Sequence, residues 1–447
     1  MLLRRPLLVS AALFLSRPVV RSSRAYSAPR VTTRVRPGDP DWPSPSEWGA
    51  LRDLVDGNLI VPQSPLSSCS QSSTGAACEQ FFKELKNPYF IGDNPVLTQT
   101  CGWVDAWTAQ PSAYVVAARN AAHVAMAVNF ARAKNLRLVV RGGGHSYLGT
   151  STAPDSLMIW TRAMNDIVLH DAFVPQGCES AVAPTPSVSV GAGAIWMHTY
   201  GAVTTGGGRY VQGGGCGTVG VAGLVQGGGF GTYSKRFGTA GSSLLEAEVV
   251  TADGATRVVN ACHDPDLFWA LKGGGGGSFG AVTRMTLRTW DLPSSFGAVS
   301  TMITARSDAA YRRLLGRFVA FYTDALFNSH WGELAKLFPR NRLEINMNFQ
   351  GLGTDQVRAL WAPFLDGVMA DYELTATPAQ TTAGPGRYRW NGDALSRFAP
   401  GSVMFDDRPG APKENFYWSG NSAEAGHVIY GFESVCRCCW QRDNRKD

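Results

Sequence analysis

Two side chains stand out in the sequence because each directly follows three consecutive glycines. His145 lies in the stretch VVRGGGHSYLG (residues 139–149), and Cys216 lies in YVQGGGCGTVG (residues 210–220). A neutral imidazole nitrogen and a thiolate are the side-chain groups best suited to forming carbon–nitrogen and carbon–sulfur bonds to an electrophilic ring. Glycines expose backbone N–H groups at little steric cost, and such groups bind phosphate and other anions. The two motifs therefore predict a bound nucleotide cofactor.

A Rossmann-type dinucleotide site is the first alternative for such glycine clusters. The pattern GxGxxG occurs twice, at residues 215–220 and 275–280. It indicates a dinucleotide site only where it follows a strand, opens a helix and precedes an acidic residue by about 20 positions. The second copy follows the helix-like segment DLFWALK, and the first is followed by another glycine cluster. The context therefore argues against a Rossmann site.

The segments around the two motifs are typical of strands alternating with helices. Residues 111–135 predict a strand and then an amphipathic helix with Val124, Val128 and Ala131 on one face. The apolar run 136–140 predicts a buried strand that ends at the first glycine triplet. Further expected elements are a strand at 187–194 followed by a helix, a hairpin at 244–260 turning at Asp253-Gly254, a helix from Pro265 capped by Asp264, and a strand at 281–290.

The glycine clusters end near residue 295, where a second domain of α+β character is expected. Residues 307–326 and 354–368 predict amphipathic helices, and residues 341–352 predict an alternating strand. In that strand Glu344 shares a polar face with Asn346 and Asn348, opposite the apolar face. A polar face could line a pocket, which makes Glu344 a candidate catalytic base. A strand facing solvent explains the pattern equally well.

Four stretches carry a resemblance to a known family. RGGGHSY and GGGCGTVGVAGLVQGGGFG contain His145 and Cys216, and they resemble the two flavin-attachment motifs of the berberine-bridge-enzyme-like oxidases. These oxidases are a branch of the vanillyl-alcohol-oxidase, or PCMH-type, flavoprotein superfamily. DLFWALKGGGGGSFGAVT resembles the segment that closes the family's FAD domain, and LLEAEVVTADG resembles the strand beside the adenine. The family usually has CPTVG where this chain has CGTVG.

The resemblance spans roughly residues 40–370 and implies an α+β fold. It implies a two-lobed PCMH-type FAD-binding domain plus a substrate domain with an antiparallel sheet backed by helices. FAD would be attached through its 8α-methyl group to His145 and through ring carbon 6 to Cys216, or through His145 alone if Cys216 only packs. No metal is expected, and the other implied cofactor-binding residues are Arg141, Gly142, Gly143, Gly144, Ser146, Gly149, Gly215, Thr218, Val219, Gly220, Gly223, Gly228, Gly231, Val249 and Gly280.

By the same resemblance, the protein is expected to be a FAD-linked oxidase. A base in the pocket would remove the hydroxyl proton of an alcohol or hemiacetal in a sugar, phenolic or alkaloid-like substrate, while hydride passes to the flavin. O2 would then reoxidise the flavin and release hydrogen peroxide. Two alternatives stay open: a dehydrogenase of the same fold with another electron acceptor, and an inactive flavin-binding protein.

The ends of the chain suggest processing and an unusual terminus. Arg4 and Arg5 precede a short apolar run and small residues near position 28, which favours an exported protein, periplasmic or secreted; a mitochondrial presequence is the alternative. The tail lacks the family's tyrosine-rich motif and resembles a truncated or frameshifted end. The expected divisions are a signal or targeting segment at 1–28, an N-terminal segment at 40–105 with a short helix at 78–85, the FAD-binding domain at 106–293, an incomplete substrate domain at 294–434 and an atypical tail at 435–447.

Composition limits the other classes of function. A chain of 447 residues with 44% hydrophobic and 17% charged residues indicates a globular protein of two or three domains. The net charge of +6 is mild and no basic stripe is interleaved with aromatics, so a small-molecule substrate and O2 are expected as partners, not nucleic acid. No apolar stretch after the N-terminus is long enough to predict a membrane span. Cys69 and Cys78 bracket a serine-rich loop and could form a disulfide.

Overall fold

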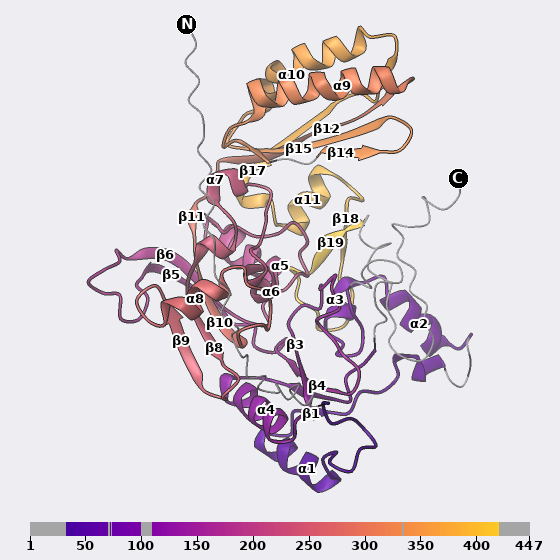
Figure 1. Cartoon of the computed structure of the whole chain (residues 1–447). Coiled ribbons are helices and arrows are strands. Elements are labelled where there is room, and N and C mark those ends of the chain that lie inside the picture. The colour runs from indigo at the N-terminus through magenta and orange to yellow at the C-terminus, as the bar shows by residue number, and fades with distance from the viewer. Residues whose placement is uncertain (1–32, 70–71, 73, 100–109, 333–334, 420–447) are drawn as a thin grey trace, which may run out of the picture. The chain divides into compact units, whose positions relative to one another are not determined.

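The computed structural model describes residues 33–69, 72, 74–99, 110–332 and 335–419 (Figure 1). The chain divides into a leading part, Met1–Arg34, and a compact unit, Val35–Asp447. All helices and strands of the described residues belong to the compact unit, and most of its sheets are antiparallel, which confirms the α+β expectation. The predicted targeting segment and the predicted tail at 435–447 lie outside the described residues.

A four-stranded sheet leads directly into the first glycine triplet. The helix α4 (Ala121–Ala133) packs on it, and its buried Val124, Val128 and Ala131 confirm the predicted apolar face. The strand before the triplet, β3, ends at Arg141, as the apolar run predicts. The strands follow the order β1 (Leu59–Ile60), β2 (Tyr114–Ala117), β4 (Ser156–Trp160) and β3 (Arg137–Arg141), of which β2, β4 and β3 run parallel.

The segment before β2 is more ordered than the sequence predicts. It begins with α1 (Pro45–Leu54), which Ser44 and Glu47 cap through reciprocal hydrogen bonds. Trp48 of α1 is buried and stacks on Tyr114 of β2 with ring centroids 3.7 Å apart, so this helix packs against the four-stranded sheet. The short helix predicted near residues 78–85 is confirmed. The remaining elements of the segment are η1 (Pro65–Cys69), α2 (Ala76–Glu84) and α3 (Pro88–Gly92).

The second sheet has five antiparallel strands, and the hairpin predicted at residues 244–260 forms two of them. The helix α8 (Pro265–Leu271) begins at the predicted proline, but Asp264 does not cap it. Its φ of 52° lies in the left-handed region and its side chain makes no capping bond, because an N-cap needs extended backbone to reach the first-turn amides. The strands follow the order β5 (Ile167–Phe173), β6 (Thr185–Gly191), β10 (Ala281–Arg288), β8 (Leu244–Val250) and β9 (Thr256–Asn260).

Short helices between these strands hold the second glycine motif. α5 (Trp196–Tyr200) continues into the π-helical segment η2 (Gly201–Gly206), and α6 (Val221–Gln226) starts just after the motif. Their buried side chains join those of the five-stranded sheet in one core. The smaller elements of this region are β7 (Arg209–Tyr210), α7 (Ser234–Phe237), η3 (Gly241–Ser243) and β11 (Trp290–Asp291).

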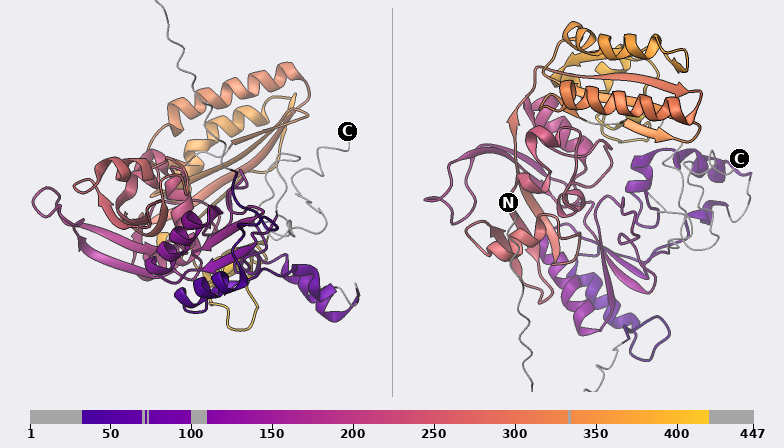
Figure 2. Two further views of the ribbon diagram at one scale, coloured as in Figure 1. Left: turned by 60° about the horizontal axis from the view of Figure 1, so that its bottom comes forward. Right: turned by 45° about the horizontal axis from the view of Figure 1, so that its top comes forward.

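The third sheet carries two long helices on one face (Figures 1 and 2). The helices α9 (Asp308–Phe321) and α10 (Thr354–Met369) confirm both predicted amphipathic segments. On β15 the apolar side chains from Leu343 to Phe349 are buried under these helices, which confirms the predicted alternation. The other elements are β12 (Ser295–Ala305), η4 (Tyr322–Leu326), β13 (Trp331–Gly332), β14 (Ala335–Phe338), β15 (Arg342–Gln350), β16 (Leu374–Ala376) and β17 (Gln380–Pro385).

After β17 the chain returns to the first two sheets. Trp390 stacks on Tyr200 of α5 with ring centroids 4.2 Å apart, and the Tyr89 hydroxyl donates to the Phe416 carbonyl at 2.7 Å. The returning segment thereby lies against α3, which precedes the first glycine motif, and against α5, which precedes the second. Its elements are η5 (Gly386–Tyr388), α11 (Gly392–Phe398), β18 (Val403–Phe405) and β19 (Phe416–Trp418).

Buried polar groups fasten the returning segment. The Asp406 carboxylate accepts hydrogen bonds from Asn87, Arg408 and Asn415 at 2.7–3.0 Å. Burial alone would raise the pKa of Asp406, but these hydrogen bonds outweigh burial and the pKa is lowered. Arg408 also pairs with Asp93 at 3.0 Å, so a charged network connects the segment to the end of α3.

Two disulfides close loops in the described residues. Cys69–Cys78 confirms the predicted pair, with a sequence separation of 9. Cys178–Cys262 has a separation of 84 and joins the loop between β5 and β6 to the residues just after β9. No local spacing marks the second pair, since only the fold brings these residues together. Among the described residues no helix has the length and apolar character needed to cross a membrane.

The two disulfides should differ in their effect on stability. Cross-linking lowers the entropy of the unfolded chain more for a longer loop, so loss of Cys178–Cys262 is expected to cost roughly 2–5 kcal/mol. We expect Cys178→Ala with Cys262→Ala to lower the melting temperature more than Cys69→Ala with Cys78→Ala does. Thermal unfolding followed by circular dichroism measures both. An equal or reversed effect would contradict this account.

Candidate active site

The two glycine motifs, distant in the sequence, meet backbone to backbone. A Cβ atom placed on Gly143 would lie 2.5 Å from the Gly220 nitrogen, and one on Gly220 would lie 2.8 Å from the Gly143 nitrogen. The first motif reaches this point from the end of β3. The second is held from the other side by α5, because Trp196 and Met197 donate their amides to the Val219 and Gly217 carbonyls. Only glycine permits so close an approach.

This approach brings the two predicted nucleophiles to one hydroxyl group. His145 Nε2 lies 3.0 Å from Thr218 Oγ1, and Cys216 Sγ lies 3.7 Å from the same oxygen. Both side chains are half-buried, and Cys216 is the free cysteine of the described residues. The structure therefore places the imidazole and the thiol, as the motifs predict, on one site.

The imidazole of His145 is held in its uncharged form. Burial lowers its pKa, and the nearby positive charge of buried Arg141 lowers it further, while a hydrogen bond with the Thr218 backbone acts in the opposite direction. The result is a pKa of about 3. The ring consequently keeps a free nitrogen lone pair at neutral pH, as a nucleophile needs.

Backbone N–H groups of both motifs are available to a ligand. Within the described part of the chain, no protein acceptor pairs with the amides of Gly143–Ser146 or of Gly213–Thr218. Gly143 and Gly144 are buried, and a buried donor without an acceptor costs roughly 1–3 kcal/mol. A bound anion or a ring with several acceptor atoms would satisfy these groups. Phosphates and ring carbonyls of a flavin nucleotide fit this requirement.

The glycines of the site are of two kinds. A Cβ on Gly213 would lie 2.4 Å from the Trp196 ring, and one on Gly231 would lie 2.2 Å from the Gly213 carbonyl oxygen, so these positions are needed for packing. By contrast, a Cβ on Gly215, Gly223 or Gly228 would meet no described atom within 4 Å. The open glycines leave room beside the free amides, which is consistent with a ligand lying over them.

The other residues predicted to bind the cofactor surround or support these loops. Gly144 has a φ of +78° and lies against the Arg141 guanidinium, while Gly142 lies beside the Ala192 carbonyl. Ser146 accepts the amide hydrogen bond of Thr150, at 3.2 Å, in the turn that contains Gly149. Gly280 and Val249 instead lie together where β10 begins beside β8, in the middle of the five-stranded sheet, and a Cβ on Gly280 would lie 2.6 Å from Val249 Cγ2.

Glu344 contacts a neighbouring strand of the third sheet. It is on β15, on the sheet face that α9 and α10 leave uncovered, and its carboxylate pairs with Lys336 Nζ of β14 at 3.1 Å. No interaction of Glu344 with His145 or Cys216 occurs among the described residues. Its role as a base therefore stays a prediction.

Four side chains beside the second motif were not anticipated from the sequence. The Tyr200 hydroxyl donates to the Gly214 carbonyl at 2.6 Å, and Tyr210 and Tyr233 line the same small pocket next to Gly213–Gly215. Arg389 completes this pocket, with its guanidinium 5.1 Å from the Phe296 ring centroid. The tyrosines stand near the glycine cluster in sequence, but Arg389 comes from the returning segment and has no local signal.

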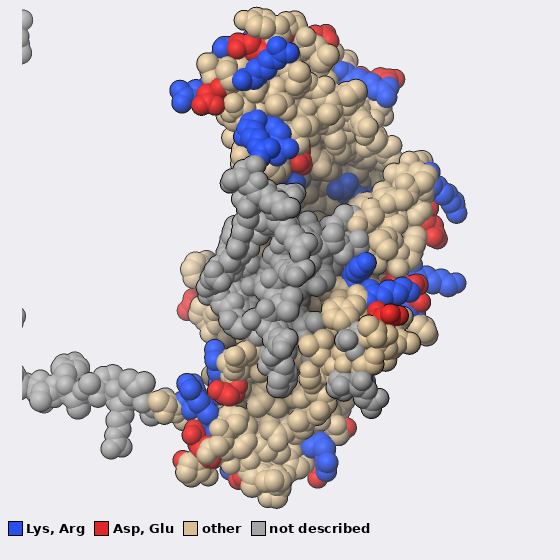
Figure 3. Space-filling view, turned by 90° about the vertical axis from the view of Figure 1, so that its right-hand side faces the viewer, with Lys and Arg blue, Asp and Glu red and all other residues tan. Residues whose placement is uncertain are grey.

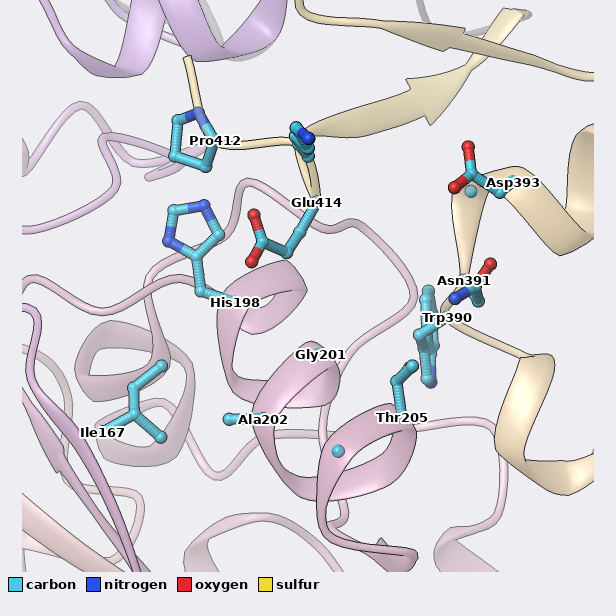
Figure 4. A pocket seen from close by; sticks show the side chains of 13 residues that line it. Ile167, His198, Gly201, Ala202, Thr205, Trp390, Asn391, Asp393, Pro412 and Glu414 are labelled. Carbon is cyan, nitrogen blue, oxygen red and sulfur yellow. The ribbon is translucent and has the colours of Figure 1, made fainter. Parts of the chain in front are cut away.

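A larger cavity of about 580 Å³ lies beside α5 and η2, bounded by the returning segment (Figure 4). His198 and Glu414 lie together on one side of it and Trp390 and Asp393 on the other. His198 Nε2 donates to the Asn415 side chain at 2.7 Å, and burial lowers its pKa. Neither His145 nor Cys216 lines this cavity, so cavity size does not mark the reactive groups.

Neither the surface drawn in Figure 3 nor the metal-ligating side chains of the described residues show a further centre. On the face drawn in Figure 3, positive and negative side chains are interspersed, with no broad patch of one sign. No group of three or more histidine, cysteine, aspartate or glutamate side chains in the described ranges is arranged to hold a metal ion. The cysteines at 436, 438 and 439 lie outside those ranges.

Comparison with known proteins agrees with this site. Residues 111–260, which include His145, Thr218 and Cys216, match the FAD binding domain family. The chain is 36% identical over 306 residues to the FAD-linked oxidoreductase asqF of Emericella nidulans, covering 61% of this chain and 51% of the relative. It thus spans about half the length of that relative. It is also 30% identical over 433 residues to the bifunctional decalin synthase calF of Penicillium decumbens, covering 90% of this chain and 72% of that protein.

Solved structures show the same architecture. The VAO-type flavoprotein MtVAO615 of Myceliophthora thermophila matches with a TM-score of 0.70 and 28% identity, over 82% of this chain and 68% of that one. Glucooligosaccharide oxidase of Acremonium strictum, described with a 6-S-cysteinyl, 8α-N1-histidyl FAD, matches with a TM-score of 0.50 and 24% identity, over 62% and 54% of the chains. Taken with the paired glycine motifs, these matches show that the chain belongs to the berberine-bridge-enzyme-like FAD-linked oxidoreductases of the VAO-type flavoprotein superfamily.

Proposed function

We propose that this chain oxidises an alcohol or hemiacetal carbon of a sugar, phenolic or alkaloid-like substrate by hydride transfer to covalently bound FAD, with O2 as the final acceptor. The observation that carries the proposal is the convergence of His145 and Cys216 on the Thr218 hydroxyl, beside two runs of unpaired backbone amides. Family membership supplies the cofactor class and the reaction type.

The proposed cofactor linkage uses both nucleophiles. We assign the 8α-histidyl link to His145 and the 6-S-cysteinyl link to Cys216, the two kinds of link described for glucooligosaccharide oxidase. The uncharged imidazole and the half-buried thiol suit these roles. The amides of Gly143–Ser146 and Gly213–Thr218 would hold the acceptor atoms of the cofactor. When bound, FAD supplies the hydride acceptor.

The chain itself must orient the substrate, limit water and accept the hydroxyl proton. We propose that Tyr200, Tyr210, Tyr233 and Arg389 hold the second glycine motif in position, since they line a pocket of only about 10 Å³ next to Gly213–Gly215, which is too small for a substrate. Glu344 remains the proposed base, on the uncovered sheet face of the third sheet. Lys336 contacts Oε1 of this carboxylate, which leaves Oε2 to accept the proton.

We also propose an exported protein. The two disulfides of the described residues would persist in an oxidising compartment. The N-terminal arginine pair with its apolar run is consistent with export.

The reaction can be tested with a panel of oligosaccharides, phenolic alcohols and alkaloids. We expect at least one compound to bleach the flavin absorbance under anaerobic conditions and to yield one hydrogen peroxide per oxidised molecule in air. Flavin bleaching without peroxide would replace the oxidase proposal by a dehydrogenase with another acceptor. A fully loaded protein that no compound reduces would point to a flavin-binding role alone.

Covalent attachment can be tested with His145→Ala, Cys216→Ala and the double variant. After acid precipitation, we expect wild type to keep all of its flavin, each single variant to keep it through the remaining link, and the double variant to release it. Peptide mass mapping identifies the attached residues. Gly231→Ala would be a poor control variant, because its added Cβ would clash with the Gly213 carbonyl. Full retention by the double variant would reject both assignments.

The lowered pKa of His145 predicts how attachment depends on pH. Because this group is protonated only near pH 3, the neutral imidazole persists from pH 8 down to pH 5. We expect the rate at which acid-stable flavin forms from apoprotein and FAD in Cys216→Ala to stay within twofold over that range. A histidine with the ordinary pKa of about 6.5 would slow about thirtyfold at pH 5. The control is non-covalent FAD binding at each pH, and a decline centred near pH 6.5 would disprove the prediction.

A further inference from the structure

The Thr218 hydroxyl lies between the two groups that we propose attach the flavin. Its oxygen is 3.0 Å from His145 Nε2 and 3.7 Å from Cys216 Sγ. Thr218 itself is buried, and its backbone carbonyl lies against Gly143 of the first motif. The residue is therefore held by the meeting of the two loops and in turn faces the ring of His145.

The Thr218 hydroxyl bears on which ring nitrogen carries the hydrogen. Nε2 is the ring nitrogen next to Thr218, at 3.0 Å, and the hydroxyl oxygen can accept a hydrogen bond from it. With its hydrogen on Nε2, the neutral ring keeps its lone pair on Nδ1.

We infer that Thr218 is a positioning residue for flavin attachment: its hydroxyl accepts a hydrogen bond from His145 Nε2–H and so presents Nδ1 as the nucleophilic nitrogen. This inference rests on the proposed covalent link at His145. It explains why Nδ1, and not Nε2, would bond to the flavin, because Nε2 is already hydrogen-bonded to Thr218.

The chemistry of attachment balances with this assignment. A C–H bond of the 8α-methyl group is replaced by a carbon–nitrogen bond to Nδ1, and the Nε2 hydrogen must leave so that the product imidazole is neutral. The two hydrogens and two electrons removed are taken, by way of the isoalloxazine ring, to O2, which becomes hydrogen peroxide. The departing Nε2 proton starts 3.0 Å from Thr218 Oγ1, so the hydroxyl lies next to the proton that has to move.

Two variants separate the hydroxyl from the shape of the side chain. Thr218→Val keeps the branched shape and the backbone carbonyl but removes the hydroxyl, and Thr218→Ser keeps the hydroxyl. Both are made in the full chain that also carries Cys216→Ala, so that acid-stable flavin reports on His145 alone. Apoprotein is mixed with FAD in air, and samples are precipitated with acid over time. The linked nitrogen is identified by NMR of the flavin peptide.

We expect attachment through Nδ1 in the parent protein, a rate at least about tenfold lower in Thr218→Val, and a rate within about threefold of the parent in Thr218→Ser. One lost hydrogen bond of about 1.4 kcal/mol corresponds to the tenfold change. Linkage through Nε2 in the parent, or an unchanged rate in Thr218→Val, would overturn the inference. Non-covalent FAD affinity and melting temperature, measured for each variant, distinguish slower attachment from weaker binding or misfolding; a loss explained entirely by either would also overturn it.

Failure of the proposed function would look different. If the parent never forms acid-stable flavin, or forms it equally in His145→Ala, the covalent link at His145 is wrong, whatever Thr218 does. If His145 is linked and Thr218→Val behaves as the parent does, the link stands and only the role of Thr218 is rejected.

Discussion

The close approach of Gly143 and Gly220 is the constraint on which the site depends. A Cβ on either residue would lie within 2.8 Å of a backbone nitrogen of the other loop, so no side chain can stand between them. The parallel strands β3 and β4 fix one loop, and the amide hydrogen bonds of Trp196 and Met197 fix the other. With this contact in place, His145 and Cys216 reach the same hydroxyl, that of Thr218. Without it, the first motif would not lie against Thr218 of the second.

The same loops are incomplete as protein alone. Their amides lack protein acceptors among the described residues, and the burial of Gly143 and Gly144 keeps those donors from water. Such donors are costly unless a ligand pairs with them. Binding of a cofactor that supplies acceptors therefore stabilises the folded chain as well as equipping it for chemistry. The neutral His145 belongs to this arrangement, because the burial and the Arg141 charge that lower its pKa come from the same packed loops.

Local patterns in the sequence predicted most elements and singled out His145 and Cys216. The 244–260 hairpin, α9, α10 and the alternation of β15 each depend on residues close in the chain. What the sequence could not predict depends on distant residues. Cys178 pairs with Cys262 only because β9 lies beside the β5–β6 connection, and Arg389 reaches Gly213–Gly215 only because the chain returns after β17. Asp264 shows the limit of a local rule, since the backbone into α8 takes a left-handed turn that defeats its cap.

The glycine motifs and the returning segment thus place different demands on the sequence. The glycine motifs tolerate almost no change at Gly143, Gly213 and Gly231, where an added Cβ would clash. The returning segment carries Arg389 and Trp390 and is held by the Asp406 network and by ring contacts. Such a segment can vary in its exposed side chains while its anchors stay fixed. We therefore expect relatives with the same histidine and cysteine motifs to keep these glycines and to differ in the exposed side chains of the returning segment.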